Sequence, residues 1–365
     1  MFSPGEYGES PPSVEEDTGA PAPDVAPPID TGAIDASIPS ARIVVFAGRR
    51  DGVPGEAAAV NVAETMRTTL SASGELGPWT FDVPPSAAAA WTRATFVGET
   101  LLLQSSAAVV RASFADGRID GGFAPLPSRG AAPEGFLRGW LVSDAGMTAA
   151  GGQAAGMFTT NVYVAPLDLR DGGIDPWELT SSTLVKARGD VTLLREGAFL
   201  YAIGGRDNGT SVAPGRDEVE VARFGADGGL GPFAATTKLV DPNADASALP
   251  MFLPIVAAGA GWVFVLGGQS TVPGALSDVA LAAKIDSATG NLGPWIALPR
   301  LPAPMSAAAA LVVNDTVLLF GGSLGATQTD GVLALSIEPS GSFGSAWKKI
   351  GSLPGPRSGL AALVY

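Results

Sequence analysis

The sequence predicts an all-β protein in which one structural unit of about 50 residues is repeated six times. Three observations predict it. A short glycine-containing phrase recurs and closes on Trp or Phe, apolar runs that end in glycine recur with a similar spacing, and segments that alternate apolar and polar residues follow those runs. Short apolar runs bounded by glycine indicate buried strands, and alternation indicates strands with one exposed face. Self-similarity at a fixed period is typical of a repeat architecture.

Residues 1–40 precede the first repeat and differ from it in composition. They hold eight acids, eight prolines and no Lys or Arg, and they lack apolar periodicity. Such a segment cannot bury enough apolar surface to offset the entropy of ordering. We therefore expect a disordered, acidic, Pro-rich tether over 1–40 and a folded domain over 41–365. The tether resembles the spacer after the lipid-anchored cysteine of bacterial lipoproteins, whose anchor and signal would have been trimmed; the alternative is a plain disordered terminus.

Each repeat is expected to contain two apolar strands joined by a short polar turn, the second of which ends in glycine. The clearest second strands are at 43–48, 200–205, 263–268 and 317–322, and weaker copies are at 101–105 and 148–152. A glycine pair at a strand end allows a sharp change of backbone direction or the close approach of another segment.

A third, alternating strand follows after a loop of variable length, and the recurring phrase then leads into a fourth strand. Alternating segments lie at 218–224, 278–285 and 331–337. The phrase contains an Asp-Gly type turn and ends in the strand that carries the aromatic residue. The closing aromatics are Trp79, Phe123, Trp177, Phe233, Trp295 and Trp347. We expect these rings to pack one repeat against the next rather than to bind a sugar.

This order of an apolar run with Gly-Gly, an alternating strand, a turn, a Trp and then Leu-Pro, often with Arg, resembles the kelch repeat over residues 41–365. The resemblance implies a six-bladed kelch-type β-propeller with four antiparallel strands per blade, similar to the central domain of galactose oxidase without its oxidase site. Residues 356–365 look like a first strand without a second, and 41–43 like a second strand without a first. We expect the two termini to share one blade, which closes the ring.

The composition excludes several kinds of chemistry. The chain has no Cys and no His, so disulfides, thiolate or imidazole metal sites and Ser-His-Asp triads are ruled out. The net charge is −14, and nothing indicates the basic patch of a nucleic-acid-binding protein. No stretch approaches the ~20 apolar residues that span a bilayer, and no signal peptide is visible. We expect no cofactor and no metal ion.

By resemblance to kelch propellers, the loops after Gly-Gly and the links between blades share one face, which is the usual binding face. An Arg beside an Asp in such a loop can recognise a carboxylate or a sugar through forked hydrogen bonds. The alternative is solvated loop charge with local salt bridges. Two loops are the richest in polar groups, and their candidate ligand-binding residues are Arg49, Arg50, Asp51, Arg206, Asp207, Asn208, Arg216 and Asp217.

Three tryptophans fall outside the repeated aromatic position, and a packing role competes with a ligand-stacking role for each. They are Trp91, Trp140 and Trp262, of which Trp91 joins the predicted ligand-binding set. A long link contains Asp241, Asn243 and Asp245 at the alternating spacing of a calcium loop. It lacks the glycine that follows and the distal Glu, so we expect an acidic surface loop there.

We predict a non-catalytic propeller of the bacterial cell envelope or exterior that binds a protein or a glycan through its loop face. The inner-strand segments are mostly Ala, Val, Leu and Thr, which argues against a polar catalytic channel. Two alternatives remain open. One is a His- and metal-independent carbohydrate-active enzyme, sialidase- or sugar-epimerase-like. The other is a structural subunit of a surface assembly, which would bury a broad apolar patch.

Overall fold

The computed structural model describes residues 41–50, 60–85, 93–105, 108–169, 173–207, 215–270 and 275–365, without the side chains of Ala47 and Val60. All of them belong to one compact unit, Pro39–Tyr365. The expectations for residues 1–40 lie outside the described residues. So do those for Asp51, Trp91 and Asn208.

Six antiparallel sheets of four strands form the structure, and we call them blades 1 to 6. From the inner to the outer strand, blade 1 consists of β30 (Ala361–Val364), β1 (Ala41–Arg50), β2 (Val60–Leu70) and β3 (Thr80–Asp82). In the same order, blade 2 consists of β4 (Arg93–Val97), β5 (Thr100–Ser105), β6 (Ala108–Ala115) and β7 (Arg118–Leu126). Blade 3 consists of β8 (Gly139–Ser143), β9 (Gly146–Ala150), β12 (Val162–Ala165) and β15 (Glu178–Leu179).

The second half of the chain repeats this plan. Blade 4 consists of β16 (Thr192–Glu196), β17 (Phe199–Ile203), β18 (Val219–Arg223) and β19 (Ala234–Ala235). Blade 5 consists of β22 (Ile255–Gly259), β23 (Trp262–Gln269), β24 (Leu276–Ile285) and β25 (Leu292–Ala297). Blade 6 consists of β26 (Ala309–Val313), β27 (Thr316–Phe320), β28 (Gly331–Ser336) and β29 (Lys348–Ser352). Three hairpins complete the strands: β10 (Gln153–Ala154) with β11 (Met157–Phe158), β13 (Leu167–Asp168) with β14 (Gly173–Ile174), and β20 (Val240–Asp241) with β21 (Ser247–Ala248).

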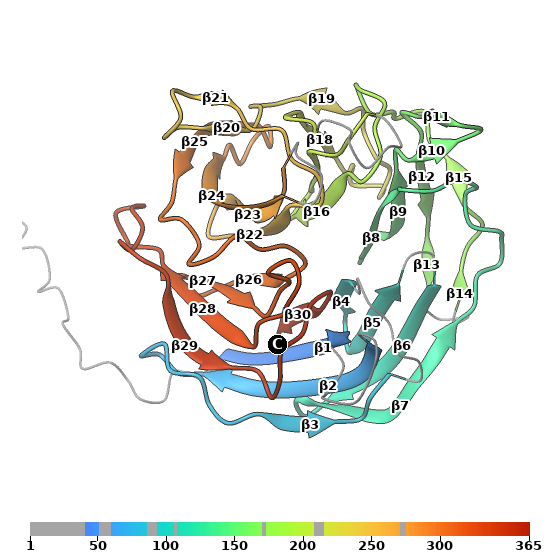
Figure 1. Ribbon diagram of the computed structural model, residues 1–365. Coiled ribbons are helices and arrows are strands. Elements are labelled where there is room, and N and C mark those ends of the chain that lie inside the picture. Colours follow the sequence, from blue (N-terminus) through green and yellow to red (C-terminus); the bar gives the residue numbers. More distant parts are fainter. Residues whose placement is uncertain are drawn as a thin grey trace, which may run out of the picture. The chain divides into compact units, whose positions relative to one another are not determined.

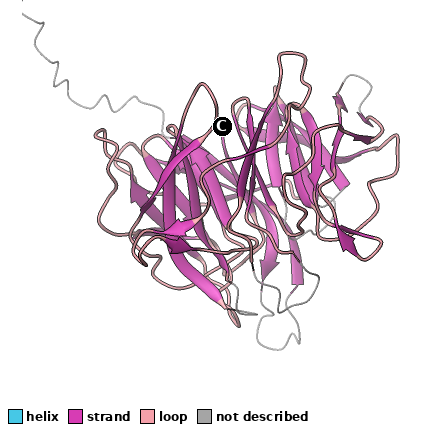
Figure 2. Cartoon of the chain, turned by 90° about the horizontal axis from the view of Figure 1, so that it is seen from above, coloured by secondary structure: helices cyan, strands magenta, loops and turns pink. Residues whose placement is uncertain are grey.

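The blades close into a ring, as Figure 1 shows. Inner strands contact one another in the order β30, β4, β8, β16, β22, β26 and back to β30. Blade 1 joins the two ends of the domain, because Phe46 of β1 pairs with Ala361 of β30 and Ile43 pairs with Val364. The structure thus confirms the six-bladed propeller and the blade shared between N- and C-terminal strands. No helix occurs among the described residues, and loops connect the strands at both ends of the ring (Figure 2).

Glycine pairs end the second strand of blades 3 to 6, where the backbone must enter the left-handed region. In blade 4, Gly204 has a φ of 60° and Gly205 a φ of 109°. A Cβ on Gly205 would lie 2.7 Å from the carbonyl oxygen of Gly189, which belongs to the link before β16. The pair therefore provides both the turn and the close approach that the sequence predicts.

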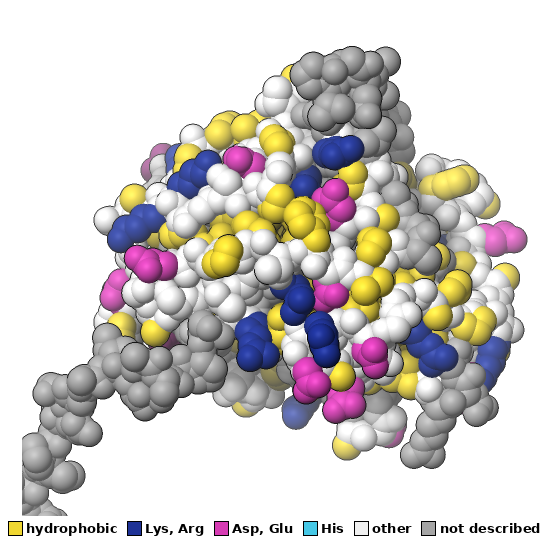
Figure 3. All heavy atoms as spheres, turned by 90° about the horizontal axis from the view of Figure 1, so that it is seen from below, with side chains coloured by type: hydrophobic (Ala, Val, Ile, Leu, Met, Phe, Trp, Pro, Cys, Tyr) yellow, Lys and Arg dark blue, Asp and Glu magenta, His cyan; other side chains and the backbone are white. Residues whose placement is uncertain are grey.

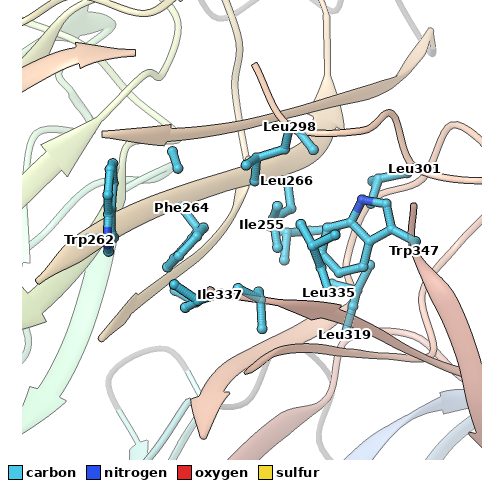
Figure 4. Packing of buried hydrophobic residues seen from close by; sticks show 14 of the residues in the cluster. Ile255, Trp262, Phe264, Leu266, Leu298, Leu301, Leu319, Leu335, Ile337 and Trp347 are labelled. Atoms are coloured by element: carbon cyan, nitrogen blue, oxygen red, sulfur yellow. The ribbon is translucent and has the colours of Figure 1, made fainter. Parts of the chain in front are cut away.

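The core lies between neighbouring blades. Figure 4 shows the cluster between blades 5 and 6, where Phe264 and Leu266 of β23 face Leu319 of β27 and Leu335 of β28. The repeated tryptophans belong to this scaffold, as expected. Three of their indole N–H groups donate to a carbonyl from the preceding blade or the link after it: Trp79 to Ser352 at 2.7 Å, Trp295 to Thr237 at 3.2 Å and Trp347 to Pro299 at 2.8 Å.

Candidate functional site

Links between blades and the loops after each second strand meet at the same end of the ring, because neighbouring strands are antiparallel. We call this end the loop face. At this face the residue that directly follows the glycine of the second-strand end forms a backbone bridge to a residue of the preceding link. Five such bridges are described: Arg49 to Ser358, Gln153 to Phe136, Arg206 to Gly189, Gln269 to Phe252 and Ser323 to Ser306. The first residue of each pair is polar in all five blades, so these positions carry polar side chains around the loop face.

In each of these five blades, the next link residue has a positive φ and stands two positions before the first residue of the inner strand. These axial positions, as we call them, are Leu137, Asp190, Leu253, Ala307 and Gly359 in blades 3, 4, 5, 6 and 1. Backbone hydrogen bonds connect two pairs of these positions: Asp190 N–H donates to the carbonyl of Leu137 at 2.7 Å, and Gly359 N–H donates to that of Ala307 at 2.7 Å. Asp190 is the one charged side chain among these five. No pattern in the sequence marked Asp190. In the sequence, the residue two positions before β4 is Trp91, which lies outside the described residues.

Asp190 forms an ion pair with Arg206, which belongs to the predicted ligand-binding set. The Arg206 Nε lies 2.5 Å from Asp190 Oδ2, and both side chains are largely buried. Burial raises the pKa of Asp190, while the nearby Arg206 guanidinium acts in the opposite direction. That guanidinium also lies over the ring of Phe252 from blade 5, 5.4 Å from its centroid. Carboxylate, guanidinium and aromatic ring therefore link blades 4 and 5 beside the ring axis.

The other predicted residues of blade 4 form an ion-pair network around Arg216. Its guanidinium lies 3.0 Å from Asp207 and 3.4 Å from Glu218, and Lys238 lies 3.1 Å from Asp217. Lys238 and Asp207 are exposed, so water screens these contacts. The structure thus brings Arg206, Asp207, Arg216 and Asp217 together, and it fits the alternative of local salt bridges within the loop as well as a ligand-binding role.

A fully buried ion pair, Arg188 with Glu220, lies next to this network and was not among the predicted residues. Arg188 Nη1 lies 2.7 Å from Glu220 Oε1, and Glu220 also accepts from the N–H groups of Val185 and Lys186 at 2.8 and 3.1 Å. Burial lowers the pKa of Arg188, and Glu220 opposes that effect. Two signals were present in the sequence: an Arg in the link after the aromatic residue, and acids within the alternating segment 218–224.

Arg49 and Arg50 stand at the loop-face end of β1, on the opposite side of the ring from blade 4. Neither has an ion-pair partner in the part of the chain that the structure describes, and Arg49 is exposed. The predicted ligand-binding set therefore divides into two sectors of one face. The blade 1 sector carries cations without an ion-pair partner among the described residues. The blade 4 sector carries an ion-pair network in which positive and negative charges nearly cancel.

Blade 3 adds a sector that no sequence signal marked. A hollow of about 370 Å³ is lined by Glu134, Gly135, Phe136, Gln153, Ala154, Ala155 and Gly156. The Phe136 side chain is 78% exposed, and Met157 at the tip of the β10–β11 hairpin is 72% exposed. These two are the most exposed large hydrophobic residues among those described.

Several candidates have structural surroundings that account for them. Trp262 is buried against Phe343, with ring centroids 5.2 Å apart, and Trp140 packs on Trp177 at 5.6 Å. In the link with calcium-loop spacing, Asp241 accepts the N–H of Asn243 and pairs with Arg300 at 3.4 Å. Within the described ranges, no group of three acids is placed to hold a metal ion.

The surface shows no field of one sign on the side drawn in Figure 3, where cationic, anionic and apolar side chains are interspersed. No helix that could cross a membrane is present among the residues described.

No protein-family model matches the chain, and no curated protein matches it. Among solved structures the chain is similar to one titled "Structure of YjhT", with a TM-score of 0.54 and 12% sequence identity. The match covers 75% of this chain and 87% of that chain. At this identity the similarity shows the fold alone, and it supports the propeller. The assignment to the kelch family stays a prediction.

Proposed function

We propose that this protein is a kelch-type, non-catalytic binding propeller whose ligand, a protein or a glycan, contacts the loop face. The observation that carries the proposal is the ion pair of Asp190 and Arg206 at the axial end of blade 4. It presents a carboxylate and a guanidinium side by side on an ordered backbone bridge, and forked donors next to an acceptor suit hydroxyl, carboxylate and peptide groups.

Arg49 and Arg50, the cations at the end of β1 in blade 1, support ligand binding at the same loop face. Arg49 is held by two backbone hydrogen bonds to Ser358, Arg49 N–H to Ser358 O at 2.7 Å and the reverse at 2.8 Å. A charged side chain on a fixed backbone loses less conformational freedom on binding than one on a mobile loop. An anionic group of the ligand would therefore be placed at Arg49 and Arg50.

A carbohydrate-active enzyme is the second candidate, and the raised pKa of Asp190 is the observation that favours it. Most glycosidases use two carboxyl groups that flank the scissile bond. Among the axial positions that are described, Asp190 has no second carboxylate beside it. The remaining side chains at these positions are Leu, Ala and Gly, which favours binding over hydrolysis.

A location at the bacterial cell envelope or exterior is part of the proposal. It is supported by the acidic, Pro-rich composition of residues 1–40, which suits an extended, self-repelling spacer. Labelling of intact cells with an antibody against the propeller would test it. Signal that requires permeabilised cells would contradict it.

The ligand can be sought with the full chain on glycan and protein arrays, using Arg206→Ala and Arg50→Ala as loop-face variants. Lys284→Ala is a matched control, because Lys284 is an exposed cation at the opposite end of the strands in blade 5. We expect array signals that fall about tenfold in a loop-face variant and stay unchanged in the control. Signals that are equal in all four proteins, or no signal, would contradict a loop-face binding role.

A further inference from the structure

Phe136 and Phe252 occupy the same place in blades 3 and 5. Each forms the backbone bridge to the residue after the glycine pair, Gln153 for Phe136 and Gln269 for Phe252. Each is followed by a leucine with positive φ, 57° at Leu137 and 48° at Leu253. The chain therefore presents one backbone setting twice with the same side chain in it.

The two rings differ in what covers them. Phe252 is 7% exposed and lies under the guanidinium of Arg206, which comes from the preceding blade. Phe136 is 78% exposed, and no described side chain stacks on it. In blade 4 the first residue of the inner strand, Thr192, pairs with Ile203, and Arg206 follows three positions later in the sequence. In blade 2 the corresponding pair is Arg93 with Gln104, so the sequence position that corresponds to Arg206 is Ala107. Alanine has no guanidinium, and no described residue of blade 2 lies over Phe136 as Arg206 lies over Phe252.

The surroundings of Phe136 suit a cation. The hollow beside the ring is lined by Glu134, whose exposed carboxylate has no ion-pair partner among the residues described. Arg138 lies beneath and is 6% exposed. Its guanidinium donates to the carbonyl oxygens of Gly151 and Glu134 and lies over the Tyr163 ring at 4.9 Å, so it holds the floor of the hollow in place. Glu134 is left as the charged side chain that faces solvent at this site.

We propose that Phe136 and Glu134 receive an arginine side chain of a partner polypeptide. The guanidinium would stack on the Phe136 ring and pair with the Glu134 carboxylate, as Arg206 does with Phe252 and Asp190 within this chain. Met157 and Ala155 offer apolar contacts for the residues next to that arginine. The excess of acids over bases in the chain, 36 against 22, also favours a basic partner segment. Because this site lies on the loop face, the proposal rests on the proposed function of that face.

The test uses the full chain and three blocked tripeptides, Ala-Arg-Ala, Ala-Lys-Ala and Ala-citrulline-Ala, titrated at millimolar concentration by NMR. Citrulline keeps the shape of arginine and removes its charge. We expect the arginine peptide to bind at least about fivefold more tightly than the citrulline peptide. Phe136→Ala and Glu134→Gln should each weaken it about threefold or more. Phe81→Ala is the matched control, because Phe81 is also exposed, at 61%, but stands on the outer strand of blade 1.

Three results would overturn the proposal: equal binding of the arginine and citrulline peptides, unchanged binding in Phe136→Ala, or no binding of the arginine peptide. Because Phe136 is so exposed, its substitution should leave the fold intact, and near-ultraviolet circular dichroism would verify that. Failure of this site is distinguishable from failure of the proposed function. Array ligands that are lost in Arg206→Ala but kept in Phe136→Ala, together with unchanged peptide binding in Phe136→Ala, would remove this site and leave loop-face binding standing.

Discussion

Arg188 and Glu220 form an ion pair that is closed to solvent inside blade 4, with side chains 0% and 1% exposed and 2.7 Å between Nη1 and Oε1. Arg188 comes from the link before the inner strand, and Glu220 comes from the third strand. Arg188 also donates to the carbonyl of Ala202 at 3.1 Å. The pair thus joins the loop-face link to the second and third strands of the blade.

Removing one partner of this pair should destabilise the fold strongly. Arg188→Met leaves the Glu220 carboxylate buried with only two backbone N–H donors, and we expect a loss of about 3–5 kcal/mol in the free energy of unfolding. The double variant Arg188→Met with Glu220→Leu should recover much of that loss, since both desolvated charges are gone. Urea unfolding of the wild type, the two single variants Arg188→Met and Glu220→Leu, and the double variant gives the coupling energy. Additive losses would show that the two residues act independently.

A related pair, Arg357 with Glu64, joins the segment before β30 to β2 in the blade that closes the ring. Arg357→Met should loosen this junction and cost about 1–3 kcal/mol. Amide hydrogen exchange of Ala361–Val364 should accelerate first, because β30 is held to β1 alone within blade 1. Lys349→Met is the control, since its pair with Asp330 is exposed on both sides. If amide hydrogen exchange of β30 accelerated equally in the control, the Arg357–Glu64 pair would have no specific role in holding β30.

The fold could be predicted from sequence because its signals are periodic and local. Apolar runs that end in glycine repeat in register with the aromatic phrase, and each copy supports the others. The shared blade followed from an incomplete repeat at either end. The structure confirms both expectations in the pairing of β1 with β30.

The site was predicted only in part, because its decisive contacts cross between repeats. Arg206 was found from its glycine pair, whereas Asp190 gained its role from a positive φ and from an arginine 16 residues later. Glu220 lies in a segment whose alternation indicates an exposed polar face, yet an arginine from a link buries it. No sequence pattern marks Phe136 as an exposed residue, because its exposure depends on which residue the neighbouring blade places over it.

The stability of the protein should depend on pH through Asp190. Burial raises the pKa of this carboxyl in the folded state, so the folded protein binds a proton more readily than the unfolded chain. Asp190 therefore contributes most to the free energy of unfolding below its ordinary pKa of about 3.9. That contribution is lost as pH rises through the raised pKa of the folded state. Asp190→Asn removes the titration and keeps a hydrogen-bonding side chain. The difference in unfolding free energy, wild type minus variant, should fall as pH rises from about 4; a difference that grows would show the opposite linkage.

Gly205 should tolerate no side chain, whereas Gly197 should tolerate one at moderate cost. Both have positive φ, 109° and 55°, but a Cβ on Gly205 would meet the Gly189 carbonyl oxygen at 2.7 Å and one on Gly197 meets nothing within 4 Å. Gly197→Ala then carries only the backbone cost of about 1–2 kcal/mol. Gly205→Ala must also displace Gly189, whose carbonyl accepts the Arg206 N–H at 2.8 Å, so we expect at least about 3 kcal/mol. Thermal unfolding of the two variants measures the difference. Equal losses would mean that φ alone requires glycine at the strand end, and that the bridge beside Arg206 can shift without cost.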